Sequence, residues 1–177
     1  QISPVSDYVG ALVSDLEITN LSDSDVAVLD QAWATHGVLF FRNQTLSEDE
    51  HIAFGERFSA IDINKFFTPV PSHPKIAQVL KNEDQDVNVG GGWHTDHSYD
   101  QAPAMGSILL AREVPEAGGD TLFASMYAAY DALSDGLKAT LAGMRAVHSS
   151  RHVFGVEAKR LHEPGNDLKG RLRNPEF

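Results

Sequence analysis

The chain has 177 residues, a formal net charge of -11, an apolar fraction of 42% and no cysteine. This size can bury a core, the acidic balance disfavours nonspecific nucleic-acid binding, and the absence of thiols excludes disulfides and thiolate-held metals. No apolar run approaches the about 18 residues of a membrane span, and the start lacks a signal-peptide pattern. We therefore expect a cytoplasmic protein that acts on a small molecule, without nucleic acid or membrane, as a homo-oligomer.

The N-terminal part of the chain is predicted to form two helices with a buried strand between them. Ser22 followed by Asp25 resembles a capping box, after which apolar residues recur at helical spacing. The short apolar run 38–41 indicates a buried strand. Ser47 with Glu50 marks the start of the second helix. Three apolar residues of this second segment are expected in the core, namely Ile52, Phe54 and Phe58.

Later segments predict a mostly β region. Four strands are expected, at residues 76–80, 105–111, 121–124 and 144–150. Residues 126–143 are predicted to be helical, with an interruption near Ser134 that can cap a new helix. Residues 81–92 form a polar loop of a length that is often functional, and residues 161–177 are predicted to be loop or partly ordered. Because neither a repeat nor a linker divides the sequence, one domain spanning residues 1–177 is the simplest interpretation.

The run Gly90-Gly91-Gly92-Trp93-His94-Thr95-Asp96 carries the strongest chemical signal. In an extended strand alternate side chains share a face, so His94 and Asp96 would point the same way, and His97 would point to the opposite face. An imidazole and a carboxylate are two of the three ligands of a 2-His-1-carboxylate triad, which leaves positions open on a non-haem Fe(II). The glycines either clear space beside a ligand or form a plain turn.

A lone His-x-Asp is weak evidence, because a surface histidine beside an acid gives the same pattern. A second motif, Gly118-Gly119-Asp120-Thr121, adds weight to the first. Thr121 begins a predicted strand, where its hydroxyl could donate to a carboxylate. Strand propensity alone is the simpler explanation of a threonine at this position.

Four ordered segments carry a family resemblance: Gly92-Trp93-His94-Thr95-Asp96, Pro103-Ala104-x-Gly106-Ser107-Ile108-Leu109, Pro115-x-x-Gly118-Gly119-Asp120-Thr121-Leu122 and Ala128-Ala129-Tyr130-Asp131-Ala132-Leu133. Together with residues 37–42, they resemble the taurine dioxygenase family of Fe(II)- and 2-oxoglutarate-dependent oxygenases. This family also includes the 2,4-dichlorophenoxyacetate dioxygenases. The resemblance covers the chain from Ile2 to about Gly155.

The resemblance implies an α+β, mainly β fold: a double-stranded β-helix, or cupin-like jelly roll, flanked by helices. It implies that His94 and Asp96 are the first two iron ligands and that Thr121 contacts the 2-oxoglutarate carboxylate. Fe(II), 2-oxoglutarate and O2 are the implied cofactor and cosubstrates. The implied reaction hydroxylates a C–H bond and releases succinate and CO2. Because halogenating relatives replace the carboxylate ligand, Asp96 favours hydroxylation over halogenation.

The third metal ligand of the family and its 2-oxoglutarate-binding arginine have no clear counterpart in this sequence. His162 lies too soon after His94 and in a Pro-Gly-Asn context unlike a barrel strand. His148 and His152 are interpreted as a strand residue and a pocket-edge residue. We therefore expect the missing groups beyond residue 177, with the C-terminal part of the fold absent from this chain.

The substrate is expected to be a small anionic organic molecule of the taurine/sulfonate or aryloxyalkanoate class. Taurine dioxygenases carry an asparagine four residues before the metal-binding histidine, and this chain has Gly90 there. A sulfonate is therefore not specifically indicated. Four residues are candidates for the substrate pocket, although surface or core roles would explain each of them: Lys65, Phe66, Asn88 and Phe154.

Two other functions compete with the oxygenase interpretation. A noncatalytic binding domain, or an incomplete fragment, could retain half of the barrel without its chemistry. A jelly-roll isomerase or hydrolase with another divalent metal would also use histidine and carboxylate ligands, but it leaves the Gly-Gly-Asp-Thr segment unexplained.

Overall fold

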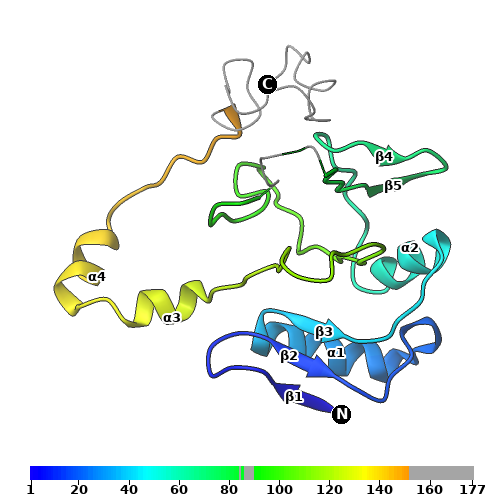
Figure 1. The fold of residues 1–177 in the computed structure, drawn as a ribbon. Coiled ribbons are helices and arrows are strands. Elements are labelled where there is room, and N and C mark those ends of the chain that lie inside the picture. Colours follow the sequence, from blue (N-terminus) through cyan, green and yellow to red (C-terminus); the bar gives the residue numbers. More distant parts are fainter. Residues whose placement is uncertain (84, 86–89, 152–177) are drawn as a thin grey trace. The chain divides into compact units, whose positions relative to one another are not determined.

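The computed structural model describes residues 1–83, 85 and 90–151 (Figure 1). The chain divides into two compact units, each made from two separate stretches of sequence. Gln1–Phe58 and Leu109–Arg145 form the first unit, and Ser59–Ile108 with the residues from Ala146 onward form the second. Both helices and sheets are present. Within the described ranges, no helix combines the length and the apolar character needed to cross a membrane. The interpretation of residues 1–177 as one oxygenase domain stays a prediction.

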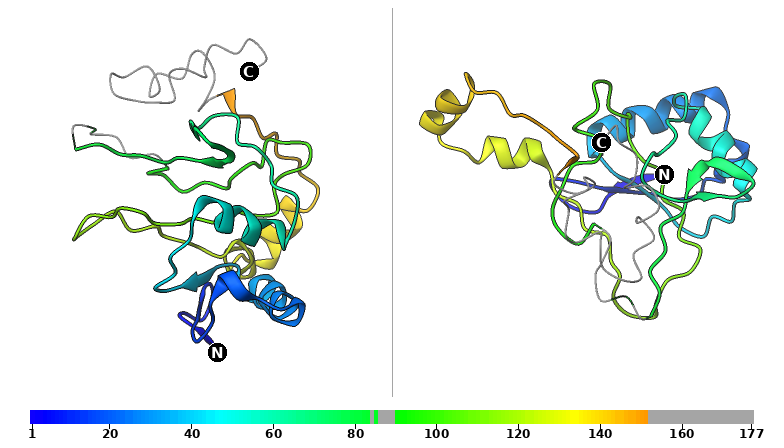
Figure 2. Two further views of the ribbon diagram at one scale, coloured as in Figure 1. Left: turned by 90° about the vertical axis from the view of Figure 1, so that its right-hand side faces the viewer. Right: turned by 90° about the horizontal axis from the view of Figure 1, so that it is seen from above.

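A three-stranded sheet organises the first unit. Strands β1 (Ile2–Pro4), β2 (Ala11–Val13) and β3 (Leu39–Phe41) lie in the order β1-β2-β3, with β1 antiparallel and β3 parallel to β2. The buried strand predicted at residues 38–41 is thus present as β3, although its side chains are only half-buried. Parallel strands need a crossover connection, which here contains the short 3-10 helix η1 (Ile18–Asn20) and helix α1. Figures 1 and 2 show α1 on one face of this sheet.

Both N-terminal helices begin at the predicted capping boxes. Helix α1 (Asp23–His36) has Ser22 as its N-cap, and α2 (Glu48–Glu56) has Ser47. In each box the serine hydroxyl accepts from the backbone N–H three residues later, and the acidic side chain there accepts from the serine N–H. These bonds satisfy amide groups that have no partner inside the helix. The predictions of both helix starts are confirmed.

The core of the first unit combines residues from β2, η1, α1, α2 and a connecting loop. Phe54 of α2 is buried, and its ring meets those of Phe41 and Phe58 edge-on, with centroids 5.9 and 5.3 Å apart. Of the three predicted core residues, Phe54 is therefore confirmed, whereas Ile52 and Phe58 are only partly buried. The buried cluster consists of Val13, Ile18, Leu29, Leu46 and Phe54. Burying one such side chain stabilises the folded chain by about 1.5–3 kcal/mol.

Two short helices end the first unit. Helices α3 (Met126–Asp131) and α4 (Asp135–Leu141) are separated at Ser134, whose hydroxyl accepts from the Leu137 N–H at 3.3 Å. The predicted helical region and its interruption near Ser134 are both confirmed. Helix α3 ends at Asp131 with Ala132 as its C-cap. Ser134, whose extended backbone has a ψ of 153°, is the N-cap from which α4 starts.

The second unit contains an antiparallel pair, β4 (Pro69–Val70) and β5 (His73–Ala77). The strand predicted at residues 76–80 is therefore displaced toward the N-terminus. Strands are absent from the other three predicted segments, all of which are described: residues 105–111, 121–124 and 144–150. These predictions are wrong for a physical reason. An apolar run suits a strand, but a strand also needs a neighbouring backbone to pair with, and none pairs with these segments in the described part of the chain.

Candidate metal centre

The motif residues His94 and Asp96 face each other in the second unit. His94 Nε2 lies 3.2 Å from Asp96 Oδ1. The extended strand assumed in that argument is not formed, because residues 93–95 are irregular and residues 96–99 form a turn. The argument from strand alternation was therefore wrong, and the turn that begins at Asp96 accounts for the approach of the two side chains.

A backbone carbonyl fixes the orientation of the His94 ring. His94 Nδ1 lies 2.7 Å from the Gly92 carbonyl oxygen. A carbonyl oxygen only accepts, so Nδ1 carries the hydrogen, and in the neutral ring Nε2 keeps its lone pair. Metal-binding histidines in proteins are commonly oriented by such a bond from the remote ring nitrogen.

The chemistry of this pair fits a divalent transition metal. In the neutral ring, the Nε2 lone pair faces a carboxylate oxygen, so two acceptors lie 3.2 Å apart and a shared cation would satisfy both. Two adjacent ligand atoms of an octahedral ion, each about 2.1 Å from the metal, lie about 3.0 Å apart. The side chains of His94 and Asp96 are 54% and 64% exposed, so an ion can reach them from solvent.

Gly90 leaves room beside the His94 ring. Its φ of +71° lies in the left-handed region, which a glycine adopts without steric cost. A Cβ at this position would lie 3.2 Å from His94 Cε1, which is closer than an ordinary van der Waals contact. The glycines were expected to form a plain turn or to clear space beside a ligand, and the geometry of Gly90 combines both.

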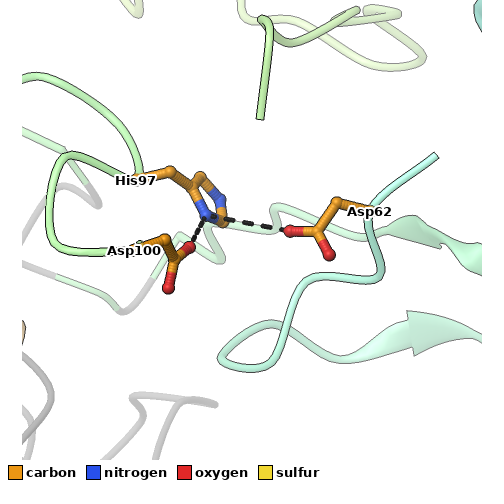
Figure 3. A group of neighbouring side chains, drawn as sticks. All are labelled: Asp62, His97 and Asp100. Carbon is orange, nitrogen blue, oxygen red and sulfur yellow. Dashed lines mark hydrogen bonds and ion pairs between the residues drawn. The ribbon is translucent and has the colours of Figure 1, made fainter. Parts of the chain in front are cut away.

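A second polar group follows Asp96 directly and was missed from the sequence. His97 Nδ1 lies 2.7 Å from Asp100 Oδ2 and 4.0 Å from Asp62 Oδ2 (Figure 3). The ligand-type atoms of these three residues all lie within 4.8 Å of one another. The spacing of His97 and Asp100 is a local signal that could have been used. Asp62 is far away in the sequence, so no motif could have connected it to His97.

Tyr99 lies between these acidic groups and an aromatic neighbour. Burial, together with the carboxylates of Asp100, Asp96 and Asp62, raises the pKa of Tyr99 to about 12. The ring of Phe66 meets that of Tyr99 edge-on, with centroids 5.9 Å apart. The phenol is therefore neutral at physiological pH and can donate a hydrogen bond but cannot act there as a base.

The other predicted site residues are only partly described. Lys65 is exposed, whereas Phe66 is 5% exposed and packs against Tyr99. Thr121 is exposed in an irregular segment of the first unit, after two glycines with positive φ. Asn88 and Phe154 lie outside the described residues. The roles assigned to all five as cofactor or pocket residues stay predictions.

The additional histidines give no third ligand in the described ranges. His148 is exposed in an irregular segment, so its interpretation as a strand residue is wrong for the same lack of a pairing partner. His152 and His162 lie outside the described residues.

Comparison with known proteins identifies the family. Residues 1–175 match the family described as taurine catabolism dioxygenase TauD, TfdA family, and the chain belongs to this family. The (S)-phenoxypropionate/alpha-ketoglutarate-dioxygenase of Sphingobium herbicidovorans is 34% identical over 164 residues, which cover 89% of this chain and 57% of that protein. The alpha-ketoglutarate-dependent 2,4-dichlorophenoxyacetate dioxygenase of Cupriavidus pinatubonensis is 34% identical over 175 residues, which cover 86% of this chain and 60% of that protein.

A solved structure agrees with this assignment. A taurine dioxygenase from Burkholderia xenovorans is 30% identical, with a TM-score of 0.65 over 84% of this chain and 52% of that one. The resemblance drawn from the ordered sequence segments is confirmed, and the fold is a mixed α/β arrangement similar to that of this dioxygenase. The chain spans about half the length of the curated relatives that it matches.

Proposed function

We propose that the protein is an Fe(II)- and 2-oxoglutarate-dependent dioxygenase that hydroxylates a small anionic organic substrate and releases succinate and CO2. The observation that carries this proposal is the His94–Asp96 pair at 3.2 Å, with the remote His94 nitrogen bonded to Gly92. Family membership supports the same chemistry, because the relatives are named as alpha-ketoglutarate-dependent enzymes. Their names favour aryloxyalkanoates, and a third relative is named as a sulfonate dioxygenase.

In this proposal His94 and Asp96 hold the iron through Nε2 and a carboxylate oxygen. A bound Fe(II) would supply activation of O2, coupled to decarboxylation of 2-oxoglutarate. The Gly92 carbonyl would hold the His94 ring with its Nε2 lone pair available to the iron, and the Asp96 carboxylate would offset part of the charge of the iron. The Thr121 hydroxyl is proposed to donate to a 2-oxoglutarate carboxylate. Lys65, Phe66, Asn88 and Phe154 are proposed to contact the substrate, with Lys65 supplying positive charge.

The proposal extends to the whole protein. A histidine as third ligand and an arginine for 2-oxoglutarate are proposed to lie in the part of the relatives' length that this chain does not span. That part would also complete a double-stranded β-helix and offer pairing partners to residues 105–111 and 121–124. We further propose a cytoplasmic location, with which the absence of cysteine agrees, and a homo-oligomeric state.

The noncatalytic alternative has less support. The phenoxypropionate, dichlorophenoxyacetate and sulfonate relatives are all named as dioxygenases.

Succinate production tests the proposal directly. Whole protein is incubated under air with Fe(II), 2-oxoglutarate and either (S)-phenoxypropionate, 2,4-dichlorophenoxyacetate or taurine. We expect succinate from the unmodified protein and none above background from His94→Ala or Asp96→Ala. His36→Gln in α1 serves as a histidine control that keeps activity. Equal succinate from the unmodified protein and His94→Ala would refute the assignment.

A further inference from the structure

The residue after Asp96 has a left-handed backbone conformation, which is uncommon for any residue other than glycine. The φ angle of His97 is 55°, in the left-handed region, where a side chain is sterically disfavoured. Such a conformation persists only where surrounding contacts compensate for it. The contacts of His97 therefore decide whether the turn of residues 96–99 keeps its shape.

Two bonds between the same residues close this turn. The Asp100 N–H donates to the His97 carbonyl at 2.9 Å, and His97 Nδ1 donates to Asp100 Oδ2 at 2.7 Å. The side chains of His97 and Asp100 are only 17% and 25% exposed. A bond to a carboxylate is stronger than a neutral one, and limited access of water reduces competition for it.

A separate loop holds the turn from outside. Asp62 Oδ2 lies 4.0 Å from His97 Nδ1, and the buried ring of Phe66 packs edge-on against Tyr99. The Asn64 side chain accepts from the Phe66 N–H at 2.8 Å and so fixes the local backbone of this loop. Two contacts, one polar and one aromatic, therefore connect residues 62–66 to the turn (Figure 3 shows the polar one).

The direction of the Asp96 carboxylate depends on this turn. The Asp96 side chain is 64% exposed, so packing around it does not fix its rotamer, and its Cα is set by the backbone that leads into His97. We propose that His97 is a positioning residue: bonded to Asp100 and facing Asp62, it holds the turn that keeps the Asp96 carboxylate opposite the His94 ring. This inference rests on the proposed function of that pair as metal ligands.

The same three groups could instead hold a second cation, because their ligand atoms lie within 4.8 Å of one another. The 2.7 Å bond between His97 and Asp100 argues for the positioning role, since it already joins the two atoms that a cation would use. Cation binding by Asp62, His97 and Asp100 is accordingly an outcome that the experiment must separate.

Two substitutions at His97 separate the side-chain bond from the backbone conformation. In His97→Asn, the amide nitrogen can replace Nδ1, and asparagine tolerates a positive φ. In His97→Gly, the backbone conformation is free of strain but the bond to Asp100 is lost. Asn43→Gly is the matched control, because Asn43 also has a positive φ, of 57°, but lies in the first unit.

Mn(II) binding to the whole protein is measured by titration calorimetry, and exchange of the Asp100 amide hydrogen is measured without metal. We expect His97→Gly to weaken Mn(II) binding about tenfold, at the lower end of the range for supporting residues of metal sites. The same variant should speed exchange of the Asp100 amide. His97→Asn should restore both values, and Asn43→Gly should change neither.

Three results would overturn the inference. If His97→Gly has the same Mn(II) affinity and the same Asp100 amide exchange rate as the unmodified chain, the His97 side chain does not hold the turn. If His97→Asn and His97→Gly weaken Mn(II) binding and speed Asp100 amide exchange equally, the imidazole is needed for a role other than the bond to Asp100. Two Mn(II) ions per chain, reduced to one by either variant, would assign a second cation site. If His94→Ala leaves Mn(II) binding unchanged, the proposed function fails, and amide exchange alone then decides whether His97 holds the turn.

Discussion

The His94 ring is held by a backbone carbonyl, so its orientation depends on the conformation of the residues that precede it. Gly92 supplies the accepting oxygen, and Gly90 has a positive φ beside the ring. A change in this backbone therefore alters the orientation of the His94 ring, while the imidazole itself stays the same. The sequence indicated a role for these glycines, but only the folded structure distinguishes Gly90, which approaches His94, from Gly92, whose Cβ position meets nothing within 4 Å.

Gly90→Ala tests this dependence. An alanine at φ +71° is strained by about 1 kcal/mol, and its Cβ would lie 3.2 Å from His94 Cε1. We expect weaker Mn(II) binding, measured by calorimetry, with little change in global unfolding. Gly136→Ala in α4 is the matched control, because its Cβ meets no neighbour and helix propensity should stabilise the chain slightly. Unchanged Mn(II) affinity in Gly90→Ala would contradict the proposed role of this backbone.

Tyr99 gives a prediction at high pH. Its pKa is about 12 in the folded chain, and tyrosine in an unfolded chain ionises near pH 10. The unfolded state therefore loses a proton first, so the contribution of Tyr99 to stability falls as pH rises from about 10 to 12 and is constant below that window. Ultraviolet titration should show that Tyr99→Phe removes a tyrosine that ionises near pH 12. Asp62→Asn should lower that pKa, and an unshifted titration would contradict the influence of Asp62.

At the scale of elements, local sequence determines where the helices begin. In α2, bonds from the Ser47 N–H and hydroxyl lower the pKa of Glu50. A lowered pKa means that this stabilisation is present above the ordinary pKa of the carboxyl group and is lost as pH falls through the lowered value. The helix start therefore depends on both members of the box.

Ser47→Ala is expected to reduce the free energy of unfolding by about 1 kcal/mol, because it removes the side-chain acceptor of the Glu50 N–H. Urea denaturation at neutral pH measures the loss. Ser47→Asp retains an acceptor and serves as the control. The difference between the unmodified chain and Ser47→Ala should shrink in acid, as Glu50 is protonated, and a difference that grows there would contradict the capping box.

The strands behave differently from the helices. A helix satisfies its backbone groups within one segment, so cap residues and spacing are enough to locate it. A strand is completed only by a neighbouring segment, which explains why β3 was found beside β2 whereas residues 105–111, 121–124 and 144–150 are irregular. These segments are apolar, as a strand would require, but an apolar pattern does not indicate which other segment could pair with them.

At the scale of the molecule, the stability of the first unit depends on contacts between segments far apart in sequence. Phe54 meets Phe41 of β3, and the core also contains Val13 and Leu29. Each ring and side chain belongs to a different element, so removing one leaves a cavity that several elements share.

Phe54→Ala is expected to reduce the free energy of unfolding by about 3–5 kcal/mol, through lost burial and the cavity left behind. The Val28 side chain lies on the exposed side of α1 and is 57% exposed. Val28→Ala should therefore change the free energy of unfolding by less than about 0.5 kcal/mol. Guanidinium denaturation followed by circular dichroism compares the two. Similar losses in both variants would show that the core does not lie where Phe54 is buried.

The sequence by itself determined the family, the helix starts at Ser22, Ser47 and Ser134, and the pairing of His94 with Asp96 as a chemical unit, because each of these is carried by neighbouring residues. Tertiary structure alone decided that a turn, and not a strand, brings His94 and Asp96 together. It also brought Asp62 to His97 and Phe66 to Tyr99. Each of these contacts joins segments that lie more than thirty residues apart in the sequence. Such segments meet only when the chain folds, and a local sequence pattern contains no information on which distant segment will be the partner.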